Sequence, residues 1–365
     1  MSWIKKTIMP IWIGVSSITL LLLVDFFIGG FFLPCHEREQ LEVSRCKDSL
    51  RVSHPVYHHD LEKNVQVSEK WGNRNYSVCT DENGFKISCN SKNKSSKNYD
   101  IAFIGDSFTE GIGLTYEETF VGQIEQSRPD LKIANLGVSS YSPSIYYSKV
   151  KFLLEQGITF KELVVYIDIS DVQDEAISFA LSDDLVVSKG LDGNHYSNLK
   201  KLVRWYFPLT YFGLYRLKNL NSPAHTGNPF SYLDEGYSRS AWTFNETSIG
   251  YGTLGVTGGI EQSLKSMTKL SELVKSKGIS LSIGVYPWPG QLLYDTAQSK
   301  QVRIWQDFCK TRCLRLHNSF ESFFSIKDKI SANKTIELYF IPGDVHHNRQ
   351  GAEVIANDFL SSLEK

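Results

Sequence analysis

Short apolar runs alternate with longer amphipathic stretches over most of the chain beyond residue 98. Four runs have the length and the flanking residues of buried strands. They cover residues 99–105, 131–136, 163–169 and 279–286. Five stretches carry apolar residues at helical spacing. They cover residues 116–126, 144–156, 260–276, 302–313 and 351–363. Because strands and helices alternate, we predict an α/β fold whose parallel sheet is covered by helices on both faces.

The longest apolar run lies near the N-terminus, from Ile8 to Leu33, and Asp25 is its one charged residue. A helix of this length crosses the roughly 30 Å hydrocarbon layer of a membrane. The run is too long for the apolar part of a signal peptide, and no small-residue cleavage pattern follows it. We therefore predict a transmembrane signal-anchor. A carboxylate is costly in lipid, so we expect Asp25 in the outer third of the span or facing a partner helix.

The flank of this run predicts its orientation. Lys5 and Lys6 precede it, and positive charge tends to stay on the cytoplasmic side. We predict a cytoplasmic tail over residues 1–6 and a single transmembrane segment over residues 7–33. The rest of the chain is then extracytoplasmic, either periplasmic or at the cell surface.

Beyond this segment, the patterning changes from weak to strong. Residues 34–97 are polar and rich in Lys, Ser and Asn, which predicts an extracytoplasmic stalk and an N-terminal extension packed on the main domain. Residues 98–365 form that main domain. Within it, residues 180–255 are irregular and are interpreted as an insertion or lid. An aromatic cluster at 205–215 is expected to pack in the core, and a lid or a membrane-proximal surface is the alternative.

Composition narrows the function classes. The 365 residues carry a net charge of −1 and no long basic stripe, which argues against a nucleic-acid binder. The six cysteines form three couples that are close in sequence, as expected for short disulfide loops in an oxidising compartment. A zinc site would need CxxC-like pairs and converging histidines, which this spacing lacks. The couples are Cys35 with Cys46, Cys79 with Cys89, and Cys309 with Cys313.

The first candidate for chemistry is Gly105-Asp106-Ser107, which stands where the first predicted strand ends and a helix begins. This position lies at the crevice where open α/β sheets bind ligands. The free amides of a helix start also stabilise developing negative charge. Ser107 is therefore a candidate nucleophile. The tripeptide is common, and a serine that caps a helix after a glycine turn is the structural alternative.

A serine nucleophile needs a base, and Asp344-Val345-His346-His347 lies just before the last predicted helix. A histidine beside an aspartate supplies a general base and the group that holds its tautomer. Successive side chains point in different directions, so one of the two rings can contact Ser107. For either histidine alone, a solvated polar loop is the alternative.

Three blocks together resemble the SGNH (GDSL-like) hydrolase superfamily over about residues 98–365. They read Gly105-Asp-Ser-Phe-Thr-Glu-Gly111, Asn135-Leu-Gly137 and Asp344-x-His346-x-Asn348-x-x-Gly351. The closest resemblance is to the membrane-anchored branch associated with bacterial surface-polysaccharide acylation. It implies a flavodoxin-like three-layer α/β/α sandwich, preceded here by the transmembrane helix.

The resemblance also implies roles for single residues. Ser107 would be the nucleophile, His346 the base and Asp344 its orienting carboxylate. The family's commoner Asp-x-x-His spacing would instead make His347 the base. The oxyanion hole would use the amides of Ser107 and Gly137.

The third oxyanion donor of the family is an Asn in a Gly-x-Asn-Asp block, and this chain departs from it. The corresponding stretch reads Asp168-Ile-Ser170-Asp171, so Ser170 is the candidate donor. The carboxylates around it form either a cation site for a metal-dependent hydrolase or an acidic cluster at a helix N-terminus. They are Asp168, Asp171, Asp174 and Glu175. We favour the second interpretation and predict no metal and no cofactor.

Three further residues are candidates for substrate binding. Asp106 and Asn135 belong to the family blocks, and Trp288 follows the fourth predicted strand at the same edge of the sheet. Trp288 either stacks on a sugar ring or caps the core.

We therefore expect an extracytoplasmic serine esterase or O-acyltransferase acting on acyl esters, in particular acetyl esters, of a glycan. Water or a sugar hydroxyl would resolve the acyl-enzyme. The expected partners are an acylated glycan or polysaccharide, the membrane and a membrane acyl-donor protein. The alternative is a non-catalytic polysaccharide-binding or assembly protein on a degenerate SGNH scaffold, which the missing Asn favours.

Overall fold

A computed structural model describes residues 14–27, 50–91, 96–189, 206–219, 239–245 and 248–363. The chain divides into two compact units. The larger unit comprises Leu50–Gly190 and Thr226–Lys365, and the smaller unit comprises Met1–Ser49 and Leu191–His225. The larger unit contains all of the candidate catalytic and substrate-binding residues.

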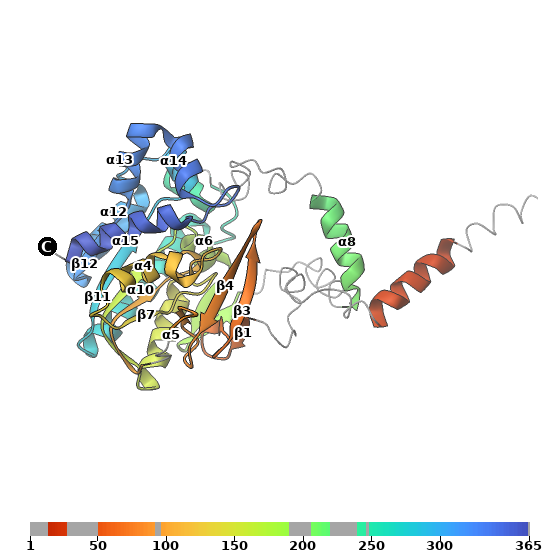
Figure 1. The fold of residues 1–365 in the computed structure, drawn as a ribbon, viewed down its shortest axis with the longest axis horizontal. Coiled ribbons are helices and arrows are strands. Elements are labelled where there is room, and N and C mark those ends of the chain that lie inside the picture. Colours follow the sequence, from red (N-terminus) through yellow and green to blue (C-terminus); the bar gives the residue numbers. More distant parts are fainter. Residues whose placement is uncertain are drawn as a thin grey trace, which may run out of the picture. The chain divides into compact units, whose positions relative to one another are not determined.

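The larger unit is built around a five-stranded parallel sheet (Figure 1). Its strands are β6 (Asn98–Ile104), β7 (Ile133–Asn135), β8 (Thr159–Tyr166), β11 (Ser280–Val285) and β12 (Arg315–Asn318). They lie in the order β12-β11-β8-β6-β7. Numbered along the chain, this is 2-1-3-4-5, the order of flavodoxin-like folds. The predicted α/β fold with a parallel sheet is confirmed.

The four predicted strands are present, and β12 was not predicted. The middle of the sheet is deeply buried: Phe103 and Ile104 of β6 and Val164 of β8 have no exposed surface. Strands buried on both faces are continuous apolar runs, which made them recognisable. In contrast, β12 lies at an edge and reads Arg315-Leu-His-Asn, which is too short and too polar to stand out.

Helices pack in two groups. One group contains α4 (Phe120–Ser127) and α15 (Arg349–Leu363). The other contains α5 (Pro143–Glu155), α6 (Asp171–Ile177) and α10 (Gly255–Ser276). Right-handed crossovers place α4 and α5 on opposite faces, because the chain passes from β6 outward to β7 and then back to β8. Further helices are α11 (Pro289–Tyr294), α12 (Lys300–Arg312), α13 (Phe320–Ile330) and α14 (Ala332–Tyr339).

The N-terminal extension is folded from Leu50 onward and belongs to the larger unit. It forms two small antiparallel sheets that flank the main one (Figure 1). Their strands are β1 (Arg51–His54) with β2 (His58–Leu61), and β3 (Gln66–Trp71) with β4 (Arg74–Thr80) and β5 (Lys86–Ile87). Residues 34–49 of the predicted stalk lie outside the described residues.

Two of the three predicted disulfides are present. Cys79 bonds to Cys89 and links β4 to the segment after β5, and Cys309 bonds to Cys313 at the end of α12. The third couple, Cys35 and Cys46, lies outside the described residues.

The predicted insertion at 180–255 is described only in parts. It opens with a hairpin of β9 (Phe179–Ser182) and β10 (Leu185–Ser188). The two turn residues, Asp183 and Asp184, have φ values of 49° and 66°, which suits the two-residue turns typical of hairpins. A 3₁₀ turn, η3 (Ala241–Thr243), precedes α10.

The smaller unit contains a helix over residues 14–27 and α8 (Pro208–Asn219). The Asp25 carboxylate accepts hydrogen bonds from the amides of Leu209 (2.8 Å) and Thr210 (2.6 Å). These amides belong to the first turn of α8, where free N–H groups favour an anion. Asp25 therefore faces a second helix, which is one of the two environments expected for it.

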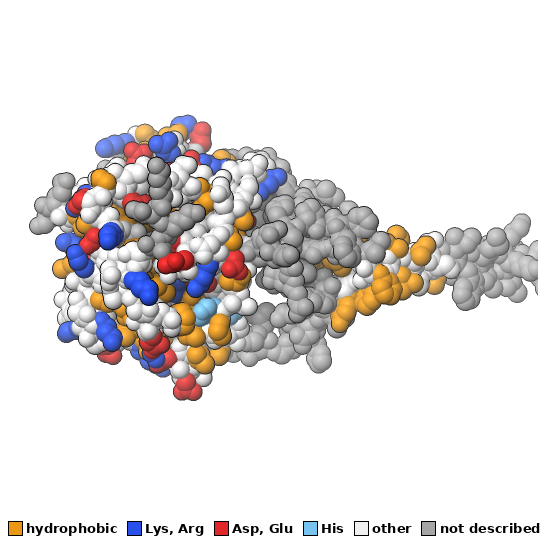
Figure 2. Space-filling view, turned by 60° about the horizontal axis from the view of Figure 1, so that its bottom comes forward, with side chains coloured by type: hydrophobic (Ala, Val, Ile, Leu, Met, Phe, Trp, Pro, Cys, Tyr) orange, Lys and Arg blue, Asp and Glu red, His pale blue; other side chains and the backbone are white. Residues whose placement is uncertain are grey.

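The aromatic cluster at 205–215 was expected in the core, and this prediction is wrong. Its described part belongs to the smaller unit, where Tyr206 stacks on Phe26 with ring centroids 5.5 Å apart. Tyr206 is 43% exposed and Leu214 is 59% exposed. The helix at 14–27 also exposes large apolar side chains, including Ile18, Leu21 and Phe27 (Figure 2).

The predicted transmembrane segment, 7–33, extends beyond the described helix at both ends. Within the described ranges, no helix combines the length and the apolarity needed to cross a bilayer.

Candidate active site

The end of β6 positions Ser107. Gly105 follows the strand, and a Cβ atom there would lie 2.1 Å from Thr109 Oγ1 and 2.8 Å from the carbonyl oxygen of Tyr166. Only glycine fits this crossing. Asp106 then caps the short helix α3 (Ser107–Glu110) by accepting a hydrogen bond from the amide of Phe108 at 3.0 Å. Ser107 is thus the first residue of a helix at the carboxyl edge of the sheet, as predicted.

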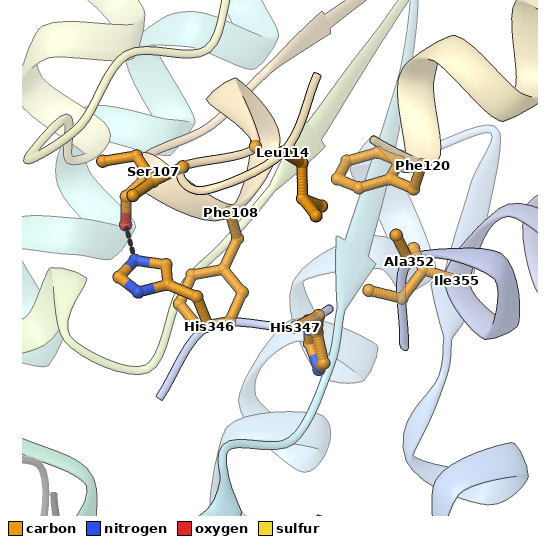
Figure 3. A pocket seen from close by; sticks show the side chains of 10 residues that line it. Ser107, Phe108, Leu114, Phe120, His346, His347, Ala352 and Ile355 are labelled. Carbon is orange, nitrogen blue, oxygen red and sulfur yellow. Dashed lines mark hydrogen bonds between the residues drawn. The ribbon is translucent and has the colours of Figure 1, made fainter. Parts of the chain in front are cut away.

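The structure brings Ser107, His346 and Asp344 together. Figure 3 shows the contact between Ser107 and His346. His346 Nε2 lies 2.8 Å from Ser107 Oγ, although 239 positions separate the two residues. His346 Nδ1 lies 2.5 Å from Asp344 Oδ1, and the same oxygen accepts the His346 amide at 2.9 Å. One imidazole nitrogen therefore faces a hydroxyl and the other faces a carboxylate, as in a Ser–His–Asp triad.

Charge and burial around His346 favour a base. Burial alone would lower the pKa of His346, but the charge and the hydrogen bond of Asp344 outweigh it and raise this pKa above 6.5. Burial alone would likewise raise the pKa of Asp344, but the His346 charge and several hydrogen bonds hold it below its usual value. Asp344 therefore stays ionised and stabilises the imidazolium.

Sequence reasoning missed Trp71. Its indole Nε1 donates a hydrogen bond to Asp344 Oδ2 at 2.7 Å, from a position 273 residues earlier in the chain. Its ring also stands edge-on to His346, with centroids 5.5 Å apart. Trp71 ends β3, a strand whose residues alternate between exposed and partly buried. Nothing in the sequence connects this strand to the C-terminal tail.

His347 was the alternative base, and the structure places it elsewhere. Its ring lies among Phe108, Tyr286, Phe323 and Phe340, with centroids 4.6–5.4 Å away. Burial lowers its pKa to about 3. Its Nε2 has no hydrogen-bond partner in the described part of the chain. His347 is thus a neutral core residue in this structure.

Gly137 differs from the expectation of a free oxyanion donor. Its amide donates to Asn135 Oδ1 at 3.0 Å, and Asn135 Nδ2 donates to the carbonyl of Thr109 at 2.8 Å. A Cβ at position 137 would lie 2.6 Å from the amide of Glu110. The Asn135-Leu-Gly137 block therefore packs closely on α3. Asn135 is buried in this contact.

Trp288 is also buried, and its indole bonds inside the protein. It is 4% exposed, donates from Nε1 to Asp168 Oδ2 at 2.6 Å and stacks on Phe108 at 5.8 Å. Of its two predicted roles, the structure supports the core contact.

The acidic residues after β8 divide into two sets. Glu175 accepts hydrogen bonds from the hydroxyls of Ser142 and Ser144, and Asp174 pairs with Arg239 at 2.7 Å. Asp168 and Asp171 instead lie beside Asp106, with oxygens of all three within 4.8 Å of one another.

The buried carboxylates of Asp106, Asp168 and Asp171 have the oxygen donors for a cation. Protonation of Asp106 and Asp171 is the other way to reduce the charge of this set. Burial, and then the neighbouring Asp168 charge, raise the pKa of Asp106 to about 8. Burial, and then the charges of Asp106 and Asp168, raise the pKa of Asp171. Tyr146, Tyr286 and Trp288 already donate to these carboxylates. Asp106 is thereby held inside the protein, under Ser107, whose hydroxyl lies 3.2 Å from it.

Ser170 lies just before α6, where its amide donates to Asp168 Oδ1 at 2.8 Å. Its side chain does not cap the helix. Its hydroxyl is therefore not used by α6.

A small pocket adjoins Ser107 and His346 (Figure 3). Its other walls are mostly apolar and come from α3 and the loop after it, from α4, from the tail before α15 and from α15 itself. They are Phe108, Gly111, Ile112, Leu114, Phe120, His347, Ala352 and Ile355.

Comparisons with known proteins give structural similarities alone. No family model matches the chain, and no curated protein matches it. A member of the lipolytic G-D-S-L family from Veillonella parvula aligns with a TM-score of 0.40 and 12% identity, over 73% of this chain and 98% of its own. The psychrotrophic esterase EstA from a Pseudoalteromonas species gives 0.38 and 12%, over 74% and 97%. An acetylxylan esterase from Geobacillus stearothermophilus gives 0.38 and 12%, over 73% and 94%.

The functional argument rests instead on this chain's own residues. The glycine turn before Ser107, the Asn135-Leu-Gly137 block on α3 and the C-terminal Asp344 and His346 meet at one edge of the sheet. In the order of these blocks and in their placement, the chain resembles the SGNH (GDSL-like) hydrolase superfamily.

Proposed function

We propose that this protein is a serine hydrolase or acyltransferase that acts on ester bonds. The observation that carries the proposal is the chain of contacts from Ser107 Oγ through both nitrogens of His346 to Asp344. A hydroxyl is a weak nucleophile unless a neighbouring base takes its proton. This geometry supplies the base, its tautomer and its orientation.

In the proposed reaction, Ser107 Oγ attacks the ester carbonyl while His346 Nε2 takes the hydroxyl proton. The amide of Ser107, at the start of α3, stabilises the oxyanion, and the hydroxyl of Ser170, which does not cap α6, is the candidate second donor. His346 then gives its proton to the leaving alcohol, and an acyl group remains on Ser107. Water or an acceptor hydroxyl, activated by His346 in turn, removes this acyl group.

The substrate and the location belong to the same proposal. We propose a short acyl ester, such as an acetyl group on a glycan, because the apolar pocket beside Ser107 is too small for a long acyl chain. A location outside the cytoplasm is supported by the disulfides Cys79–Cys89 and Cys309–Cys313, since disulfides persist in oxidising compartments. The exposed apolar side chains of the helix at 14–27 support a lipid anchor.

Turnover of p-nitrophenyl acetate and labelling by a fluorophosphonate test the mechanism. A fluorophosphonate forms a Ser–O–P bond and releases fluoride, so mass spectrometry should find the adduct on Ser107. Ser107→Ala should abolish turnover and labelling. Ser127→Ala, which changes an exposed serine on α4, should leave both unchanged. Turnover that persists in Ser107→Ala would exclude this mechanism.

A non-catalytic glycan-binding protein is the second candidate. The engaged amide of Gly137 and the missing Asn after β8 favour it, because both weaken the oxyanion hole. It predicts binding of an acetylated glycan, measured by calorimetry, with no adduct on Ser107. Detection of the adduct would reject it.

A further inference from the structure

Both oxygens of the Asp344 carboxylate are bonded in this structure. Oδ1 accepts from the ring and the amide of His346, and Oδ2 accepts from the indole of Trp71 at 2.7 Å. A carboxylate held at one oxygen can still rotate about its Cβ–Cγ bond. A second donor on the other oxygen fixes the plane of the carboxylate and thereby the direction in which it holds the imidazole.

The Trp71 ring lies between His346 and the loop after α3. It stands at 89° to the His346 ring, with centroids 5.5 Å apart. On another side it lies close to the loop after α3, because a Cβ atom at Gly113 would lie 3.4 Å from Trp71 Cδ1. The indole thus contacts the His346 ring and also donates a hydrogen bond to the carboxylate that orients this ring.

The strand pair that carries Trp71 is anchored separately from Asp344. Trp71 pairs with Arg74 at the end of the β3–β4 ladder. Arg74 Nη2 donates hydrogen bonds to both oxygens of the Glu118 carboxylate, at 2.5 and 2.6 Å. On β5, the buried Lys86 Nζ donates to the carbonyls of Gly111 and Leu114. The small sheet is therefore attached to the loop that follows Ser107.

We propose that Trp71 is a positioning residue of the active site, which acts through Asp344 and extends the chain of contacts from Ser107 into the N-terminal sheet. This inference rests on the proposed function. It makes residues 50–91 a part of the catalytic apparatus, although their sequence predicts an extension.

The test is a double-mutant cycle on the full chain. Trp71→Phe keeps a ring and removes the N–H donor, and it should lower kcat for p-nitrophenyl acetate by roughly 10- to 100-fold, the range for losing one hydrogen bond to a charged group. KM should change little. In an Asp344→Asn background, the same change should lower kcat by less than about threefold, because the partner of the indole is already altered.

A pH profile separates positioning from a general loss of structure. Without the indole donor, the Asp344 carboxylate is a stronger base and holds the His346 proton more tightly. The midpoint of kcat/KM against pH should therefore move upward in Trp71→Phe. Trp305→Phe, which changes a buried tryptophan on α12, should leave the midpoint unchanged.

Replacement of Trp71 by benzothienylalanine repeats the test without a change of shape, because sulfur takes the place of the indole N–H. The same fall in kcat is expected. An unchanged midpoint, together with equal losses in both backgrounds, would overturn the proposal. Failure of the proposed function itself looks different, because Ser107→Ala would then turn over as fast as the unaltered protein.

Discussion

At the scale of residues, His346 and His347 are neighbours in the chain, but their rings enter different surroundings. One ring lies between Ser107 and Asp344, and the other lies in an aromatic part of the core. The sequence could limit the base to these two positions and could not choose between them from local chemistry. The direction of each side chain depends on the backbone path of the tail along the sheet edge. A hydrogen bond from the amide of Ile341 to the carbonyl of His346 fixes this path.

Matched substitutions test this assignment. His346→Phe should lower kcat by about 10³-fold or more, as loss of a catalytic histidine does. His347→Phe should keep kcat within a few-fold, because it retains an apolar ring among Phe108, Phe323 and Phe340. Steady-state kinetics on p-nitrophenyl acetate measures both. Equal losses in the two variants would contradict the assignment.

The pH dependence of activity follows from the same residues. A general base works only when it is neutral, and Asp344 raises the pKa of His346 above 6.5. We expect kcat/KM to be low in acid and to rise with a midpoint above 6.5. Asp344→Asn removes the charge that raises this pKa, so its residual activity should have a lower midpoint. A midpoint that is the same in both proteins would show that Asp344 does not act on His346.

At the scale of elements, the helix that carries Ser107 is only four residues long and takes its position from its neighbours. Asn135 and Gly137 contact its backbone, and the buried Glu110 accepts the amide of Ser139 at 2.6 Å and pairs with Arg51 at 2.8 Å. The family resemblance identified the Asn-Leu-Gly block. It suggested an oxyanion donor, whereas the structure shows a packing contact.

Gly137→Ala tests this packing. The new Cβ would lie 2.6 Å from the amide of Glu110 and 2.7 Å from backbone and side-chain atoms of Thr109, so α3 must shift. We expect a loss of about 1–3 kcal/mol of stability, typical of overpacking, and slower fluorophosphonate labelling of Ser107. Gly213→Ala, where no atom lies within 4 Å of the new Cβ, is the control. Unchanged labelling in Gly137→Ala would show that α3 does not depend on this contact.

At the scale of the whole molecule, the parts predicted best are those whose signals are local. The strands β6, β8 and β11 are apolar runs, and the Gly105-Asp106-Ser107 turn lies directly after one of them. Contacts of the N-terminal extension could not be predicted, because they join polar residues far apart in the chain. Trp71 with Asp344 and Arg51 with Glu110 are examples. These contacts form only when the extension lies against the main sheet.

A buried ion pair offers the clearest test of this integration. Lys149 on α5 has a fully buried side chain, and its Nζ lies 2.7 Å from Asp60 Oδ1 on β2. Burial lowers the pKa of Lys149. Asp60 also accepts hydrogen bonds from Tyr57 at 2.7 Å and from the amide of Leu61 at 2.9 Å. The extension and the main domain thus share one desolvated charge pair.

Removing one partner of such a pair leaves the other charge buried, which typically costs about 3–5 kcal/mol. We expect Lys149→Met to lower the free energy of unfolding by this amount in urea titrations. Lys151→Met, two positions along α5, breaks a half-exposed pair with Asp184 and should cost less than about 1 kcal/mol. The alternative is an extension that is merely attached to a domain that folds without it. Lys149→Met would then unfold residues 50–91 in a separate, early transition. Hydrogen exchange would show this as a loss of protection in β1 to β5 while β6 and β8 stay protected. A single transition at lower urea concentration is the result expected, because the Asp60–Lys149 pair lies inside one cooperative core.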